Sequence, residues 1–352
     1  MHLYDAARPI LFRLPAETAH NTIHGLLRAA QRTPLTGLLR NRYLVDDERL
    51  QVDTLGQHFP NPVGVAAGFD KNAHVPPALA ALGFGFVEVG GVTAEPQAGN
   101  PRPRMFRLRE DGALINRMGL NNHGADVVGE RLARTGPAAG VPVGVNVAKS
   151  EHVGEADAPA DYRETYEAVG DAADFVVVNV SCPNSQGFEA LQNRESMAAI
   201  LGELRDAGAR PLLVKLSPDL PEPALADAVE LVDELGLDGV VAVNTTTERP
   251  EELRSPNRTE AGGLSGDPLE PRATEVVRFV AERTDAPVIG VGGVDAAADA
   301  YAKIRAGASL VQLYTGLVYE GPSLARDINR GLLDLLERDG FDSVADAVGA
   351  DL

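Results

Sequence analysis

Short apolar runs alternate with longer stretches of helical periodicity along the chain beyond Asp53. The runs are rich in valine and other β-branched residues, which is typical of the buried strands of a parallel sheet. Eight runs occur, at 62–67, 86–89, 142–147, 175–180, 212–216, 239–243, 287–291 and 310–313. Helical spacing lies between most of them, at 76–82, 196–207, 223–235, 271–283 and 296–305. This alternation predicts the α/β class and a (β/α)8 TIM barrel, whose reactive groups lie on loops at the carboxyl ends of the strands.

Polar side chains recur at those strand ends. Asn146 and Asn179 each follow a valine-rich run, Lys215 interrupts another, and Asn244 with Thr245 follows a fourth. A single asparagine there would more often satisfy a local turn. Repetition over several strands instead favours an active site assembled at one end of the barrel. Residues 91 to 141 are long for one connection, and we expect a lid or a substrate loop there.

The first 45 residues have a different pattern. Residues 3 to 40 fit two short amphipathic helices, with breaks near Leu14-Pro15 and at Pro34. We therefore divide the chain into a helical extension, residues 1–45, and a barrel, residues 46–352. The apolar faces would either dock on the barrel or form an apolar entrance at a membrane surface. No apolar run approaches the ~20 residues that span a bilayer.

Composition excludes some functions. The 352 residues carry a net charge of −19, which opposes binding to nucleic acid and suits a protein from a high-salt cytoplasm. The single cysteine excludes an intramolecular disulfide and a multi-cysteine cluster, and we expect no metal.

Glycine-rich segments suggest a phosphorylated cofactor. Gly290 to Val294 ends the seventh run, Tyr314-Thr315 ends the eighth, and Gly262 to Gly266 precedes the seventh. Loops after the last two strands of such barrels commonly hold a phosphate, and glycine permits close backbone approach.

From Tyr4 to Leu336 the chain resembles the dihydroorotate dehydrogenases, most closely their quinone-linked, membrane-associated class. The motifs that carry the resemblance are Ala67-Gly68-Phe69-Asp70-Lys71, the segment from Gly99 to Leu108, Leu114 to Gly119, Asn179 to Asn184, Asn244-Thr245-Thr246 and Gly262 to Gly266.

The resemblance implies FMN as cofactor and oxidation of (S)-dihydroorotate to orotate in de novo pyrimidine biosynthesis. It implies substrate contacts at Lys71, Asn116, Arg117, Met118, Gly119, Leu120, Asn179, Asn184, Asn244 and Thr245. It implies FMN contacts at Ala67, Gly68, Phe69, Asp70, Lys71, Gly91, Asn146, Asn179, Lys215, Val243, Gly266, Gly293, Tyr314 and Thr315. Lys215 matches a lysine beside the flavin, where positive charge favours the reduced, anionic ring.

Cys182 occupies the position of the base that takes the substrate proton. The quinone-linked class usually has serine there, and the soluble enzymes have cysteine. Gly91 and Val243 also depart from the pattern, because threonine is usual at both positions.

The helical extension, His20 and Arg107 match the lining of the family's quinone tunnel. The resemblance therefore implies a membrane quinone as electron acceptor and a peripheral location on the cytoplasmic side of the cell membrane. Cys182 keeps open a soluble enzyme that uses fumarate or NAD. A dihydrouridine synthase-type barrel also uses a cysteine, but the acidic charge disfavours RNA. A non-catalytic flavin-binding barrel does not explain the retained substrate positions.

Overall fold

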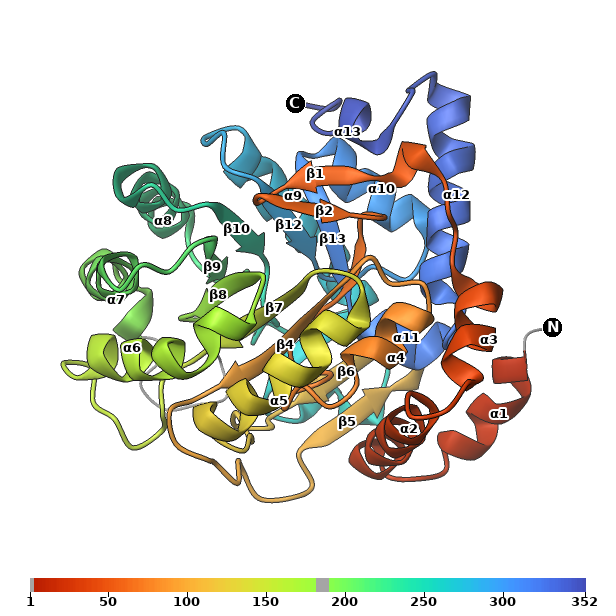
Figure 1. The fold of residues 1–352 in the computed structure, drawn as a ribbon, viewed down its shortest axis with the longest axis horizontal. Coiled ribbons are helices and arrows are strands. Elements are labelled where there is room, and N and C mark those ends of the chain that lie inside the picture. Colours follow the sequence, from red (N-terminus) through yellow and green to blue (C-terminus); the bar gives the residue numbers. More distant parts are fainter. Residues whose placement is uncertain (1–2, 182–189) are drawn as a thin grey trace.

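The computed structural model describes residues 3–181 and 190–352, and it contains a closed barrel of eight parallel strands (Figure 1). In chain order the barrel strands are β3 (Val63–Val65), β4 (Phe86–Val92), β7 (Val143–Val147), β8 (Phe175–Asn179), β9 (Leu212–Leu216), β10 (Gly239–Ala242), β12 (Val288–Val291) and β13 (Ala308–Leu313). All eight predicted strands are confirmed, since each apolar run overlaps one barrel strand.

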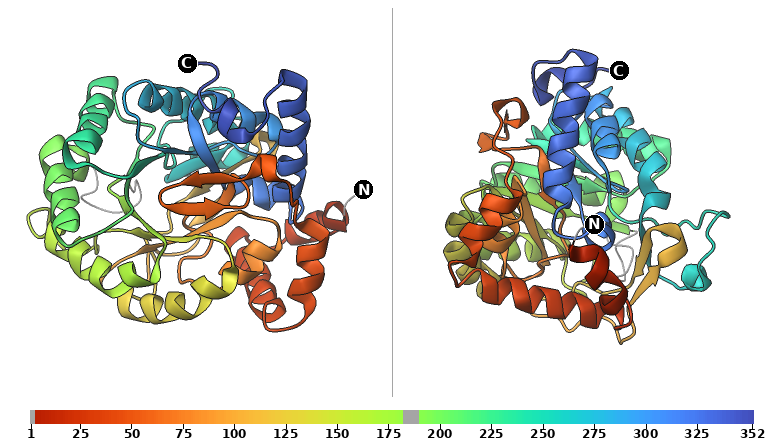
Figure 2. Two further views of the ribbon diagram at one scale, coloured as in Figure 1. Left: turned by 45° about the horizontal axis from the view of Figure 1, so that its top comes forward. Right: turned by 90° about the vertical axis from the view of Figure 1, so that its right-hand side faces the viewer.

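Helices surround the strands (Figure 2). They are α4 (Pro76–Ala81), α5 (Ala125–Ala139), α6 (Ala158–Val169), α7 (Arg194–Asp206), α8 (Glu222–Leu235), α9 (Glu270–Ala281), α10 (Ala297–Arg305), α11 (Thr315–Glu320), α12 (Leu324–Asp339) and α13 (Val344–Ala347). The five predicted helical segments correspond to α4 and α7 to α10. The pattern did not predict α5, which contains Gly129, Gly136 and Pro137.

Aromatic rings fill one end of the barrel interior. Phe86 and Phe175 are fully buried, and each ring lies where a side chain on Gly64 or Gly144 would collide with it. The ring of Phe59 packs edge-on against Phe86, with 5.3 Å between centroids. Phe59 comes from the hairpin of β1 (Val52–Thr54) and β2 (Gln57–Phe59) that precedes the barrel. This end is therefore a packed core, which leaves the other end for chemistry.

A small antiparallel sheet lies at the other end of the barrel, next to the carboxyl ends of the strands. It consists of β5 (Met105–Leu108), β6 (Ala113–Asn116) and β11 (Gly263–Gly266), in the order β11-β6-β5. Alternation of side chains divides its two faces: Ile115 packs with Leu108 and Leu264 in a separate apolar cluster, whereas Leu114 lines cavities. The expectation of a loop over residues 91 to 141 was thus incomplete, because the segment contains this hairpin and α5.

The amino-terminal extension contains three helices, not the two that were predicted. They are α1 (Leu3–Leu11), α2 (Ala16–Ala30) and α3 (Leu35–Tyr43). Pro15 and Pro34 precede the second and third helices, so both breaks fall where they were expected. The helices lie outside the barrel ring, where α1 contacts α11, α2 contacts α4 and β5, and α3 contacts α4 (Figure 1). Among the described residues, no helix is both long and apolar enough to cross a membrane.

Candidate active site

A cavity lies between the carboxyl ends of the barrel strands and the β11-β6-β5 sheet. Its lining includes eighteen of the residues that sequence reasoning assigned to substrate or cofactor: Ala67, Gly68, Lys71, Gly91, Asn116, Met118, Gly119, Leu120, Asn146, Asn179, Lys215, Val243, Asn244, Thr245, Gly266, Gly293, Tyr314 and Thr315. The fold thus brings together residues that lie as far apart in the sequence as Ala67 and Thr315.

Five predicted site residues are not part of that lining. Phe69 faces a second cavity, and the carboxylate of Asp70 is buried beside His24 and His74. The guanidinium of Arg117 donates to Glu260 at 2.8 Å, outside the lining. Cys182 and Asn184 lie outside the described residues.

A buried carboxylate, which sequence reasoning missed, lies beneath the cavity. Glu88 in β4 is fully buried, and it accepts hydrogen bonds at 2.7 Å from the amides of both Asn146 and Gln312. Its Oε1 lies 3.8 Å from Nζ of Lys215. An ionised carboxylate only accepts hydrogen bonds, so it forces both amides to turn their NH2 groups toward it.

A chain of hydrogen bonds extends from Asn146 to further amides and fixes their orientation as well. The oxygen of Asn146 accepts from the NH2 group of Asn179 at 3.1 Å, and the oxygen of Asn179 accepts from the NH2 group of Asn244 at 3.3 Å. The oxygen of Asn244 accepts from the backbone N–H of Thr245 at 2.8 Å. One acidic side chain therefore fixes the donor and acceptor pattern along one wall of the cavity.

Two buried polar atoms of the lining have no hydrogen-bond partner among the described residues. They are Oε1 of Gln312 and the hydroxyl of Tyr314. A buried acceptor without a partner costs free energy unless a ligand or water supplies the hydrogen bond. Burial also raises the pKa of Tyr314, so its hydroxyl stays protonated at neutral pH.

Glycines open the far wall. Gly293 has a φ of 67°, and a Cβ built there would lie 2.3 Å from Cβ of Glu270. Gly266 has a φ of 102°, and its Cβ would lie 2.3 Å from the carbonyl oxygen of Gly112. Glycine is therefore required at both positions, and a backbone without side chains allows an anion to approach closely. A cation, amides with fixed direction, an unpaired acceptor and glycine loops together fit a flavin mononucleotide.

Two acidic side chains in the cavity oppose the binding of a phosphate. Asp267 and Asp295 line the same cavity near these glycines. Burial, together with neighbouring Asp267, raises the pKa of Asp295 to about 7. The pair therefore carries less negative charge below neutral pH than its two carboxyl groups suggest.

A second, apolar cavity of about 630 Å³ lies between α1, α2 and the barrel. His20 and Arg107, the two predicted tunnel residues, both line it, together with Phe69, Ile23 and Leu27. Met105, Leu114 and Tyr314 line both cavities. The two spaces therefore meet at these three side chains.

The extension is attached to the barrel at several polar contacts. Glu17 of α2 receives hydrogen bonds from Arg104 at 2.8 Å and lies 3.0 Å from Arg102. Burial alone would raise the pKa of Glu17, but the hydrogen bonds from these two arginines lower it. Arg107 donates to the carbonyls of Leu11, the last residue of α1, and of Leu14, in the turn that follows.

The fold and the two adjacent cavities define a (β/α)8 barrel with one polar and one apolar cavity at the carboxyl ends of its strands. Comparison with known proteins makes this specific, since the dihydroorotate dehydrogenase family profile matches residues 49–336. A relative from Haloarcula marismortui, named dihydroorotate dehydrogenase (quinone), is 69% identical over the full length of both chains. A relative of the same name from Anaeromyxobacter sp. is 49% identical and covers 99% of this chain and 98% of its own.

A solved structure agrees with these relatives. The ligand-free DHODH of Eimeria tenella superposes with a TM-score of 0.89 at 38% identity, and the match covers 96% of this chain and 99% of that one. The chain belongs to the dihydroorotate dehydrogenase family, a flavin-dependent family of oxidoreductases. The resemblance inferred from the motifs is therefore confirmed.

Proposed function

We propose that this chain oxidises (S)-dihydroorotate to orotate with FMN and passes the electrons to a quinone, as a step of de novo pyrimidine biosynthesis. The observation that carries the proposal is the meeting of the two cavities at Met105, Leu114 and Tyr314. One space has the amides and cations that an orotate-like ring requires, and the other has the apolar walls that a quinone requires. A flavin at the junction would serve both.

Within the polar cavity, Lys71 is the natural partner of the substrate carboxylate. Asn116, Asn179 and Asn244 supply donors and acceptors for the ring edge. Lys215, with Asn146, would hold the flavin ring, while Gly266 and Gly293 would hold its phosphate. When bound, the flavin accepts two electrons and a proton from the substrate, and a protein base must take the second proton.

We assign that base to Cys182, which follows β8 and Asn179 in the chain. A thiol ionises near ~8.5, so it needs less assistance than a serine hydroxyl near neutral pH. Replacing Cys182 by alanine should slow flavin reduction by ~10² to 10⁴ and leave orotate binding intact.

Anaerobic addition of dihydroorotate to the purified yellow protein tests the proposed function directly. Bleaching of the flavin absorbance, followed by recovery on addition of a quinone, is expected. Recovery with fumarate or NAD but not with a quinone would instead favour the soluble class, which the cysteine kept open. No bleaching at all would contradict dihydroorotate as the substrate.

The extension also supports peripheral membrane contact on the cytoplasmic side. Ile10, Leu26 and Leu38 are 66%, 61% and 67% exposed, and Leu14 and Leu35 are also exposed. Residues 1–45 contain six arginines and two acidic residues, so they carry +4 within a chain of −19. Apolar side chains next to arginines suit an anionic bilayer surface.

Cosedimentation with anionic vesicles tests this contact. Replacing Ile10 and Leu38 by serine should reduce binding, whereas Val127→Ser, at an exposed apolar position of α5, should not. Equal binding of both variants and the parent protein would contradict a membrane-facing extension.

A further inference from the structure

Four of the seven histidines in the chain form a row between α2 and the barrel. His20 and His24 are four residues apart in α2, which places both rings on one face of the helix. The ring centroids of His20 and His24, of His24 and His74, and of His74 and His123 are each 5.7 Å apart. Neighbouring rings at this spacing are within reach of a direct or a water-bridged hydrogen bond.

The two ends of the row lie in different environments. His20 lines the apolar cavity, and its ring centroid is 6.3 Å from that of Tyr314 at the junction with the polar cavity. His123 lies at the other end, just before α5, and it is exposed. The row therefore leads from water to the inner part of the proposed quinone space.

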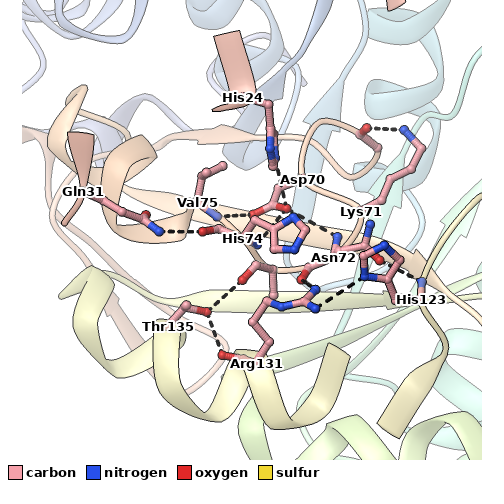
Figure 3. A network of polar contacts seen from close by, with 12 residues as sticks. His24, Gln31, Asp70, Lys71, Asn72, His74, Val75, His123, Arg131 and Thr135 are labelled. Carbon is pink, nitrogen blue, oxygen red and sulfur yellow. Dashed lines mark hydrogen bonds and ion pairs between the residues drawn. The ribbon is translucent and has the colours of Figure 1, made fainter. Parts of the chain in front are cut away.

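A fully buried carboxylate holds the middle of the row (Figure 3). Asp70 accepts hydrogen bonds from the backbone N–H groups of His74 at 2.9 Å and Val75 at 2.7 Å. Its Oδ1 also lies 3.3 Å from Nε2 of His24. The carboxylate therefore faces Nε2 of His24 and fixes the backbone of His74 beside it, so both histidines stay in the row.

The charge on the row is set by its surroundings. Burial, with a smaller contribution from Lys71, lowers the pKa of His20 to about 3. Burial and Arg131 lower the pKa of His74 to about 4, although Asp70 opposes the shift, and Arg28 acts in the same direction as Arg131. Glu17 weakly favours protonation of His20. Both rings are therefore neutral at pH 7, with one nitrogen that donates and one that accepts, as a relay requires.

Reduction of a quinone creates the demand for such a relay. A quinone becomes a quinol by taking up two electrons and two protons. A reduced flavin bound as an anion would supply two electrons and one proton, so one further proton would have to come from water. Of the groups that line the apolar cavity, Tyr4 donates to the carbonyl of Val318, Arg107 donates to the carbonyls of Leu11 and Leu14, and burial raises the pKa of Tyr314, so these three are poor sources of the proton.

We propose that His123, His74, His24 and His20, organised by Asp70, form a relay that carries this proton from water to a quinone oxygen in the apolar cavity. The inference rests on the proposed quinone-linked function. In the forward direction His20 gives the hydrogen on one ring nitrogen to the quinone oxygen, which becomes a hydroxyl, and takes a proton on its other nitrogen from Nδ1 of His24, whose Nε2 hydrogen stays with Asp70. His24 is in turn reprotonated from His74, with His123 and water at the entrance.

Stopped-flow reoxidation of the dihydroorotate-reduced holoenzyme by a soluble short-chain quinone tests the relay. His24→Phe and His74→Phe keep ring volume but remove the nitrogens, and His74→Ala leaves space for added imidazole. His58→Phe is the matched control, because His58 is exposed in β2, outside the row. Ferricyanide is the second acceptor, since it takes electrons without protons.

We expect quinone reoxidation to slow about 10- to 100-fold in the His24 and His74 variants, with a larger solvent deuterium isotope effect. Millimolar imidazole should restore the rate in His74→Ala. Flavin reduction by dihydroorotate and ferricyanide reoxidation should match those of His58→Phe, although the thermal unfolding midpoint of His24→Phe should fall because the buried Asp70 loses its side-chain partner.

Unchanged quinone rates in the row variants would overturn the proposal. A loss that imidazole does not restore, or that ferricyanide shares, would also overturn it, because the row would then only support structure. If the parent protein itself is not reoxidised by quinone, the proposed function fails instead, and this measurement comes first.

Discussion

At the scale of single residues, the direction of the hydrogen bonds is set by Glu88. The carboxylate is fully buried and binds two amides while it lies 3.8 Å from Lys215. A buried charge of this kind is costly unless it is paired and hydrogen-bonded, and here it has both kinds of partner. Asn146, Asn179 and Asn244 then present a defined pattern of hydrogen-bond donors and acceptors to the polar cavity.

Replacing Glu88 by glutamine should disturb both ligands. The amide can donate as well as accept, so the amide directions are no longer fixed, and Lys215 loses its negative neighbour. We expect a more positive reduction potential of bound FMN, because the net charge near the ring becomes more positive. Orotate should bind about tenfold more weakly, in line with ~1.5 kcal/mol for a charge-assisted contact.

The control is Glu130→Gln, at an exposed position of α5. In this variant the reduction potential of bound FMN, measured by dye equilibration, and the affinity for orotate, measured by titration, should equal those of the parent protein. An unaltered potential and unaltered orotate affinity in Glu88→Gln would show that the amide wall does not depend on the carboxylate.

We expect cofactor binding to depend on pH because of Asp295. Burial and Asp267 raise its pKa to about 7, so the group is neutral below that pH and anionic above it. As the pH rises from 6 to 8, a carboxylate forms in the cavity that is proposed to hold the FMN phosphate. Affinity for FMN should then fall about fivefold, which corresponds to ~1 kcal/mol of repulsion at water-like dielectric.

Asp295→Asn should remove that contribution. The phosphate itself ionises near ~6, so the informative quantity is the difference between variant and parent in fluorescence titrations of the apoprotein with FMN. Parallel pH profiles for the two proteins would contradict the assignment. Folding stability should depend on pH in the same direction. The raised pKa of Asp295 contributes stability at low pH, and this contribution is lost as the pH rises through 7.

Several site residues could be predicted from sequence, and others could not, for a physical reason. Lys215 was conspicuous as a cation within an apolar strand, and Asn146 and Asn179 recurred at strand ends. Glu88 and Gln312 carry the same signal, one polar residue inside a valine-rich run. Nothing in the sequence indicated that the two side chains meet, because β4 and β13 lie on either side of β3 only in the closed barrel.

At the scale of elements, regular apolar runs made all eight barrel strands predictable. The three-stranded sheet was missed because its strands contain polar residues such as Arg107, Asn116 and Ser265 in place of a continuous apolar run, and because β11 pairs with β6 across about 150 residues of chain. Helix α3 was missed because its pattern is weakly amphipathic and most of its residues stay exposed. Local periodicity reports burial on one face, and α3 buries little.

The amino-terminal helices should be separable from the reductive half of the reaction. Removal of residues 1–43 deletes one wall of the apolar cavity but none of the residues that line the polar cavity. Dihydroorotate should still bleach the flavin, whereas reoxidation by a hydrophobic quinone should be lost. Stopped-flow absorbance measures both steps on one sample, and a circular dichroism melt establishes that the truncated protein is folded. Rapid quinone turnover by the folded truncation would contradict a quinone space under α1 and α2.

At the scale of the whole molecule, charge is distributed unevenly. The chain carries 51 acidic and 32 basic residues, yet its first 45 residues are net positive. The barrel and its carboxyl-terminal helices therefore hold all of the acidic excess. Such an excess destabilises the folded state by self-repulsion at low ionic strength, when charges interact over ~10 Å or more.

Added salt should therefore stabilise this protein markedly. Between 0.1 M and 1 M KCl the screening length falls from ~10 Å to ~3 Å, and most of the repulsion between surface carboxylates disappears. We expect the thermal unfolding midpoint of the FMN-loaded protein to rise over this range and then to level off, with NaCl and KCl equivalent. Sulfate at equal ionic strength separates screening from preferential exclusion, because exclusion continues to increase stability after screening is complete. A midpoint that does not change from dilute buffer to 1 M KCl would show that ion pairs such as Arg305 with Asp339 and Asp351 already compensate the acidic surface.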